Sequence, residues 1–497
     1  MALSISEIKN IMSNGRCSRR KHHAAEGQRY YEAEHDILKC RLFYYNADGE
    51  LVEDKTRSNI KICHPFFTEL ADQLSAFMLS FKDNPIRARA GADGLQEMLD
   101  LYFDDDFWSE AADLITGAYS KGWEYLYGYK NEDNRIAFQC ADSLGVEEIP
   151  ARDADDGQDH VLYWYKDTMD KGKKDVWRIQ DWNAKEVRYY MQVGTSGKIE
   201  LDSDATVNPR PHVVFTDEET GQRMGYGMGF IPFWRLDNNR RQISGLKPIK
   251  GLIDDYDMMQ CGLSNNLADF DTPLHVVSGF QGDNLDELQQ NLKTKKIVGV
   301  DAEGDVQIRT VEIPYQARQA KAADDEKNIY RFGMGFNSSA VGDGNVTNVV
   351  IRSRYTLLEL KAKKLERRLK KLLKQLVKVV LDEINAENET DYQLSDVYFD
   401  FVHEIMTNET ENLANEKVQA ETRQIEVNTI LNIAANVGDE QTLKALCEVM
   451  DWDYEELKDQ VEKLQVEQDT AAARSALGGV VTDEQAAEAG AGEVFGQ

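Results

Sequence analysis

Residues 333–376 read GMGFNSSAVGDGNVTNVVIRSRYTLLELKAKKLERRLKKLLKQL, and this stretch decides the fold. It opens with a small, polar loop, and a loop of this length between two helices is uncommon unless it is functional or disordered. A helix is predicted from Ile351 to about Ala386, roughly 50 Å long at 1.5 Å per residue. One face of this helix carries the apolar residues Leu358, Leu365, Leu369, Leu372, Leu376 and Val380.

A second amphipathic helix precedes the loop. Residues 244–270, SGLKPIKGLIDDYDMMQCGLSNNLADF, place an apolar residue at every third or fourth position, and Ser244 is a candidate N-cap. Pro248 falls in the first turn, where its missing N–H costs nothing. The expected stripe on this helix includes Ile249, Ile253, Tyr256, Met259 and Leu263.

Between this helix and the loop lies a compact insert, Thr272–Pro314. It reads as a strand (PLHVVSGF), a short helix (DNLDELQQNLK) and two more strands (KKIVGV and DVQIRTVEI). An alanine-rich helix over about Tyr315–Phe332 then returns the chain, so we expect the helices on either side of the insert to be neighbours.

The rest of the chain mixes helices and strands. Residues 1 to about 105 read as mainly helical, with an amphipathic helix over Ile60–Phe81, and a further helix is expected over about Asp106–Ser120. Trp123–Phe233 alternates aromatic and β-branched runs with turn clusters, which predicts antiparallel hairpins. The strand-like YFDFV follows the long helix, residues 405–469 read as acidic helices, and 471–497 as a disordered tail. The expected class is α+β.

Composition limits the function. The 497 residues include 58 Lys plus Arg and 88 Asp plus Glu, for a net charge of −30. This balance opposes tight binding to DNA phosphates, but it leaves open a conduit in which DNA slides. The mean hydropathy of −0.56 and the lack of a long apolar run predict no membrane span, and no secretory signal is expected. Six dispersed cysteines lack zinc spacing, and we expect most to be buried and free.

The sequence gives little support for an enzymatic function. Asp254, Asp255 and Asp257, or the run Asp104–Asp106, suggest a Mg²⁺-dependent nuclease, but adjacent residues of a helix point in different directions. Gly342-Asp-Gly-Asn-Val-Thr lacks the lysine of a phosphate-binding loop. We assign no catalytic, cofactor-binding or metal-binding residue, and we expect no cofactor.

The long helix is also strongly basic. Lys361–Lys378 holds nine Lys or Arg and one acid, Glu366. Such a run is able to contact DNA, but the favoured interpretation is a solvated face whose charges pair with acidic neighbours in the same or another subunit.

Taken in order, these segments resemble the portal proteins of tailed bacteriophages, in the branch typified by phages of Gram-positive bacteria with long flexible tails. The resemblance covers most of the chain. It is carried by the helix 244–270, the mixed insert, and the loop with the long helix. Residues 59–89, NIKICHPFFTELADQLSAFMLSFKDNPIRAR, add a looser match to the N-terminal segment of the family.

The resemblance implies a portal fold in a ring of about twelve subunits. The implied parts are a wing (1–234), two stem helices (235–271 and 315–332), a small α/β clip (272–314), a tunnel loop (333–349), a long wing helix with its return strand (350–402), a helical crown (403–470) and a disordered tail (471–497).

The implied function is a channel at one capsid vertex for packaging, retention and ejection of double-stranded DNA. The implied partners are other copies of the chain, the terminase large subunit, a head-completion adaptor, and capsid and scaffolding proteins. The resemblance also implies that the ring is assembled in the host cytoplasm and resides in the virion. Another virion structural protein, such as a minor head protein, is the main alternative because it shares the acidic, helical composition.

The resemblance places the tunnel loop against DNA. Since the loop lacks Lys and Arg, we expect steric or hydrogen-bonding contact and no phosphate clamp. The candidate DNA-facing residues are Asn337, Ser338, Ser339, Asn345 and Asn348. The candidate hinges are Gly333, Gly335, Gly342 and Gly344.

Overall fold

We describe the protein from a computed structural model of the whole chain. The residues described are 3–46, 48–55, 57–92, 94–131, 133–151, 158–169, 172, 174–216, 223–270, 274–280, 300–309, 314–337, 348–403, 417, 422–432, 434 and 439–450. They divide into two compact units. The first consists of Met1–Asn345 with Val349–Met406, and the second of Val346–Asn348 with Thr407–Gln497.

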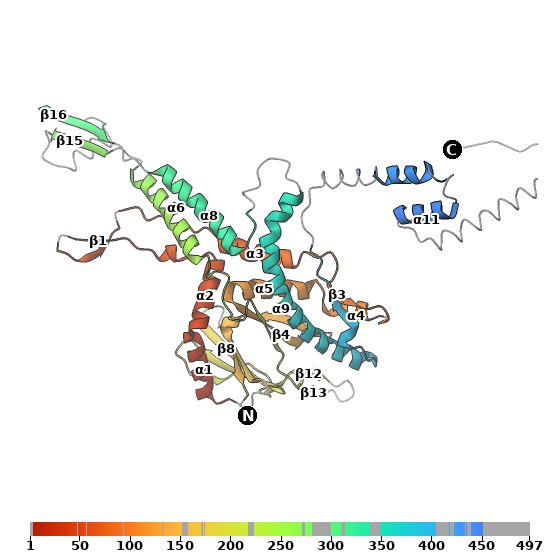
Figure 1. The fold of residues 1–497 in the computed structure, drawn as a ribbon. Helices are drawn as coiled ribbons and strands as arrows, with labels where there is room; N and C mark the ends of the chain where they lie inside the picture. Colours follow the sequence, from red (N-terminus) through yellow and green to blue (C-terminus); the bar gives the residue numbers. More distant parts are fainter. Residues whose placement is uncertain are drawn as a thin grey trace, which may run out of the picture. The chain divides into compact units, whose positions relative to one another are not determined.

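Helices form the larger share of the first unit (Figure 1). The starts of α1, α2 and α5 are capped by side chains. Ser4 forms a capping box with Glu7, and the Asp104 carboxylate accepts the Phe107 N–H at 3.0 Å. The α-helices are α1 (Ile5–Cys17), α2 (Arg19–Tyr31), α3 (Phe66–Met78), α4 (Leu95–Tyr102), α5 (Asp105–Lys121), α6 (Lys250–Phe270), α8 (Tyr315–Gly333) and α9 (Asn348–Asn388), with the 3-10 turns η1 (Asp36–Lys39), η2 (Ser143–Gly145) and η6 (Leu394–Asp396).

The strands form small sheets in which every recorded pair is antiparallel, and the pairs within Trp123–Phe233 confirm the antiparallel hairpins predicted there. The largest sheet has the order β10-β9-β8-β7-β6, with β11 beside β9, and a second has the order β14-β4-β5. Their strands are β4 (Trp123–Lys130), β5 (Ile136–Ala141), β6 (Val146–Pro150), β7 (Gln158–Met169), β8 (Lys174–Trp182), β9 (Glu186–Val193), β10 (Ile199–Leu201), β11 (Arg210–Pro211) and β14 (Phe233–Asp237).

Four two-stranded sheets complete the described strands. One of them joins distant parts of the chain, since the strand after the long helix pairs with the strand after α3. The pairs are β1 (Phe43–Tyr45) with β2 (Leu51–Glu53), β3 (Ile86–Ala88) with β17 (Val397–Phe399), β12 (Val213–Thr216) with β13 (Arg223–Tyr226), and β15 (Leu274–Phe280) with β16 (Val300–Arg309).

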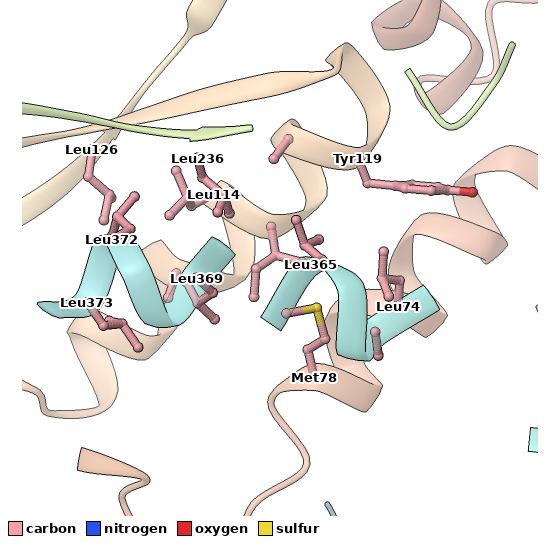
Figure 2. Close-up of a cluster of buried hydrophobic side chains, with 14 of the residues drawn as sticks. Leu74, Met78, Leu114, Tyr119, Leu126, Leu236, Leu365, Leu369, Leu372 and Leu373 are labelled. Carbon is pink, nitrogen blue, oxygen red and sulfur yellow. The ribbon is translucent and has the colours of Figure 1, made fainter. Parts of the chain in front are cut away.

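The core of the first unit is built around α9. All six stripe residues predicted for this helix are at most 3% exposed. Figure 2 shows leucines of α9 among side chains from α3, α5 and the β14-β4-β5 sheet. The leucine period therefore identified the buried face, because helical residues three or four apart share one face. The labelled neighbours are Leu74, Met78, Leu114, Tyr119, Leu126 and Leu236.

Several predicted boundaries differ from the structure. The helix expected over Ile60–Phe81 starts only at Phe66, because residues 58–64 run extended along α6. The helix expected from Ser244 starts at Lys250, and Ser244 instead accepts the Leu246 N–H at 3.0 Å in the turn before it. Helix α8 ends at Gly333 and α9 starts at Asn348, so both ends of the expected loop are helical.

The remaining predictions are tested in part. The first and last strands of the insert are present as β15 and β16, whereas its expected helix lies in residues 281–299, outside those described. In the second unit, residues 422–432 and α11 (Asp439–Met450) are helical, and the tail 471–497 is outside the described residues. Of the described helices, none has both the length and the apolar character to cross a membrane.

The cysteines differ from the expectation. Five are recorded as free, but only Cys261 and Cys447 are buried. Cys63 and Cys140 are half-buried, and Cys40 is exposed. The prediction of free thiols holds for these five, and the prediction that most are buried was wrong.

Candidate functional site

The helices α6 and α8 lie side by side, as expected for segments on either side of an insert (Figure 1). Lys321 of α8 binds the Asp255 carboxylate of α6 at 2.6 Å. The Arg318 side chain of α8 reaches α6 at Gly262, where a Cβ would lie 2.9 Å from one of its guanidinium nitrogens. The strands β15 and β16 continue from the far ends of this pair.

The apolar stripe predicted on α6 is covered unevenly. Ile249 and Ile253 are fully buried in the main core. Tyr256 packs edge-on against Phe66, with ring centroids 4.9 Å apart. Met259 and Leu263 are half-buried, and Leu267 further along the same stripe is 52% exposed. Among the described residues, only the first half of the stripe therefore belongs to the core of this unit.

A polar stripe on α6, missed by the sequence analysis, holds the extended segment 58–64, here called the strap. Alternate N–H groups of the strap are accepted by side chains spaced four residues apart on α6. The four contacts are His64 N–H to Asp257 (3.0 Å), Ile62 N–H to the Cys261 sulfur (3.1 Å), Ile60 N–H to Asn265 (2.6 Å) and Ser58 N–H to Asp269 (3.0 Å). These polar residues lie four positions apart in the sequence, but the prediction for this helix considered only its apolar residues.

Asp257 is the centre of a buried polar cluster. One carboxylate oxygen lies 2.6 Å from His35 Nδ1 and the other 2.7 Å from His64 Nδ1. Burial alone would raise the pKa of Asp257, but hydrogen bonds with His35 and His64 outweigh it and hold this pKa below its usual value. The arrangement attaches the N-terminal segment to α6.

The same cluster has the donor types of a metal site. Atoms of His35, Cys63 and Asp257 lie within 4.8 Å of one another, and this is the one such group found among the residues that the structure describes. Both Asp257 oxygens are already engaged by imidazoles, so the arrangement is explained without a metal.

The other carboxylates considered for Mg²⁺ point elsewhere. Asp254 contacts Tyr30 and Lys250, and Asp255 contacts Lys321. Asp257 contacts two imidazoles, so Asp254, Asp255 and Asp257 have three separate sets of partners. This is expected because neighbouring positions on a helix point in different directions.

The first residues of the expected tunnel loop are packed against the first unit. A Cβ at Gly333 or Gly335 would lie 2.6 or 2.0 Å from the Leu70 side chain, so close packing explains glycine at both positions. The Gln73 amide accepts the Phe336 N–H at 3.0 Å and donates to the Phe336 carbonyl at 2.8 Å. Asn337 donates to Glu326 at 3.0 Å.

The remaining loop candidates are only partly described. Asn348 is the first residue of α9. Ser338, Ser339, Gly342, Gly344 and Asn345 lie outside the described residues. The DNA-facing and hinge roles of the loop therefore stay predictions.

Lys361 of α9 lies beneath the end of α8. Its ammonium group donates to the Gly333 carbonyl at 3.0 Å and lies 4.3 Å from the centre of the Tyr119 ring. Burial lowers the pKa of Lys361 to about 7. This lysine joins the long helix to the segment that leads into the loop.

Fewer basic residues of α9 form ion pairs with carboxylates than expected. Lys363 binds Glu359 and Lys370 binds Glu366, each four residues away on the same helix. For the other basic residues of Lys361–Lys378, no carboxylate lies within 4.0 Å among the residues that the structure describes. Four of them, Lys364, Arg367, Arg368 and Lys371, line a groove of about 630 Å³ between α9 and β14.

Comparison with known proteins identifies the family. The family described as "Phage portal protein, SPP1 Gp6-like" matches residues 15–473. The portal protein of Bacillus phage SPP1 is 26% identical over 352 residues, which cover 69% of this chain and 67% of that protein. The portal protein of Clostridium phage phiCD119 is 22% identical over 440 residues, which cover 82% and 88%. The match spans both described units and nearly the whole sequence, and the chain therefore belongs to the SPP1 Gp6-like family of phage portal proteins.

Proposed function

We propose that this chain is one subunit of the ring at a capsid vertex through which double-stranded DNA is packaged, retained and ejected. The family match over residues 15–473 carries the proposal, because it includes the helix pair, the insert, the loop and the long helix together. Portal family membership implies a homo-oligomeric ring within the capsid, and we propose about twelve copies.

In this proposal α6 and α8 are the stem, with 235–271 and 315–332 as its limits. Together the two helices carry seven acidic and five basic residues. The slight acidic excess supports a channel wall without strong phosphate-binding positions, along which DNA slides in either direction. Residues 333–349 form the tunnel loop, 1–234 and 350–402 the wing, and 403–470 the crown.

The insert 272–314 is the proposed clip. It docks the terminase large subunit during packaging and later the head-completion adaptor, while capsid and scaffolding proteins contact the ring from outside. The β16 strand carries acidic residues at alternate positions, Asp301, Glu303 and Asp305. Reversal of these three charges is expected to abolish adaptor binding with the ring intact, and unchanged binding would refute the docking role.

Ring formation is tested by native mass spectrometry of the full chain with negative-stain imaging. The expected result is a closed ring of roughly twelve subunits with a central hole. A protein that stays monomeric under all assembly conditions and cleaves DNA with Mg²⁺ would overturn the proposal.

The loop is tested by deletion of residues 338–345 alone, which spares the contacts of Phe336 with Gln73. We expect rings to assemble normally, and packaging or retention of DNA to be impaired. Normal packaging by this variant would rule out the proposed role of the loop.

A further inference from the structure

The β1–β2 hairpin exposes apolar side chains that none of the described residues of its own subunit covers. All six strand residues are exposed. A two-stranded hairpin is at best marginally stable alone in water, and a contiguous exposed apolar cluster marks an interaction surface. The exposed fractions are 52% for Phe43, 49% for Tyr44, 73% for Tyr45, 59% for Leu51 and 36% for Val52.

The hairpin is nevertheless well formed. In its turn the Asn46 side-chain oxygen Oδ1 accepts the N–H groups of Asp48 and Glu50, at 3.1 and 2.8 Å, and Gly49 supplies the positive φ of 78°. The strap that follows is tied to α6 by the four N–H contacts described above. In Figure 1 the hairpin extends away from the helices of this unit. It is thus presented outward on a defined support, which lowers the entropic cost of binding.

The chemistry of the hairpin specifies its partner. Residues 43–53 contain three carboxylates, Asp48, Glu50 and Glu53, and no Lys or Arg. Its tyrosines offer ring faces, which attract Arg and Lys side chains. A matching surface must combine unpaired basic groups with apolar walls.

The groove between α9 and β14 has this combination. Its basic residues follow one side of α9, and its floor includes the apolar side chains of Phe233, Trp234, Leu236 and Leu372. Its two carboxylates, Glu148 and Asp237, are both bound to Arg235, at 2.5 and 2.9 Å. Apolar walls and carboxylates suit a protein hairpin better than a phosphate backbone. The hairpin of the same chain does not fill the groove, since its strand residues are exposed.

We propose that the β1–β2 hairpin of one subunit docks in the α9–β14 groove of the next subunit around the ring. The contact joins two different surfaces, and such heterologous contacts generate closed rings when the rotation between subunits closes. The inference rests on ring assembly in the proposed function and adds to it the surfaces that hold neighbouring subunits together.

The test exchanges the charges of the two surfaces. One full-length variant carries Asp48→Lys, Glu50→Lys and Glu53→Lys, a second carries Lys364→Glu, Arg368→Glu and Lys371→Glu, and a third carries both sets. Native mass spectrometry at one protein concentration and ionic strength measures the fraction in rings. Each single set is expected to lower the subunit–subunit affinity by at least about tenfold, and the combined variant is expected to restore it.

The matched control is Lys374→Glu with Lys378→Glu, two reversals on the same helix outside the groove lining. This control is expected to form rings as the wild type does. Circular dichroism verifies that each variant folds. If a triple set unfolds the chain, Glu50→Lys, Lys371→Glu and their combination are compared instead. Loss of rings in each single variant and recovery in the combination are again expected.

Three results would overturn the inference. These are normal rings from either single set, a folded combined variant that does not recover rings, or a groove variant that loses DNA binding while rings persist. Failure of the wild type to form rings under any condition would instead count against the proposed function.

Discussion

The helices α9 and α6 carry similar apolar stripes but bury them differently. On α9 every predicted stripe residue is at most 3% exposed. In the α6 stripe burial is complete at Ile253 and at Ile249 directly before the helix, it is partial at Leu263, and Leu267 is 52% exposed. Helical period shows which residues share a face, whereas the elements that cover that face come from elsewhere in the chain or from another subunit. The α6 stripe therefore extends beyond the core that the described residues form.

The largest effect is expected at the centre of the α9 stripe. Leu369→Ala should lower the free energy of unfolding by about 3 kcal/mol, because it leaves a cavity in a fully buried cluster. Leu267→Ala on α6 is the matched control and should change stability by no more than about 0.5 kcal/mol. Denaturant unfolding of both variants gives the comparison, and equal losses would show that the two stripes do not differ.

Lys361 makes the stability of α9 depend on pH. Its folded-state pKa of about 7 lies below the unfolded value of about 10.4, so the unfolded chain binds more protons between these values. Stability should therefore rise with pH across this window, by roughly 2–3 kcal/mol from about pH 7 to about pH 9. Thermal unfolding of Lys361→Met should lack this rise, and parallel profiles for the two proteins would contradict the burial of the charged lysine.

Asp257 gives a pH dependence of the same sign on α6, but at acidic pH. Its lowered folded-state pKa provides stability that is present above the unfolded value of about 3.9 and is lost as the pH falls through the folded value. Asp257→Asn should cost about 2 kcal/mol near pH 7 and progressively less below about pH 4. A constant difference across this acidic range, in thermal unfolding of both proteins, would rule out the ionic contribution.

The smallest effect concerns the strap. Asn265→Ala removes the acceptor of one strap N–H and should cost about 1 kcal/mol. Hydrogen exchange of the Ile60 amide should accelerate more than that of amides in the middle of α9. Unchanged protection at Ile60 would mean that the side-chain contacts on α6 do not hold the strap.

Local patterns predicted several elements accurately. The leucines from Leu358 to Leu376 identified the buried face of α9, and the runs after Trp123 identified the antiparallel strands. Both predictions depend only on the geometry of one helix or one strand, which short stretches of sequence encode.

Contacts between distant segments were not predictable in this way. The amphipathic pattern over Ile60–Phe81 indicated one helix, but its first residues gain more from pairing their N–H groups with α6. The pairing of His35 with Asp257 joins residues 222 positions apart. A single sequence carries no local signal for such a contact.

The sequence by itself determined the α+β class, the order of helix pair, insert, loop and long helix, and the family that this order resembles. Only the tertiary structure decided which half of the α6 stripe is buried, that the polar stripe of α6 holds the strap, and that the β1–β2 hairpin is left exposed. The physical reason is that the period of a helix or strand follows from its own backbone geometry, whereas burial and hydrogen-bond partners depend on which distant segments fold against it.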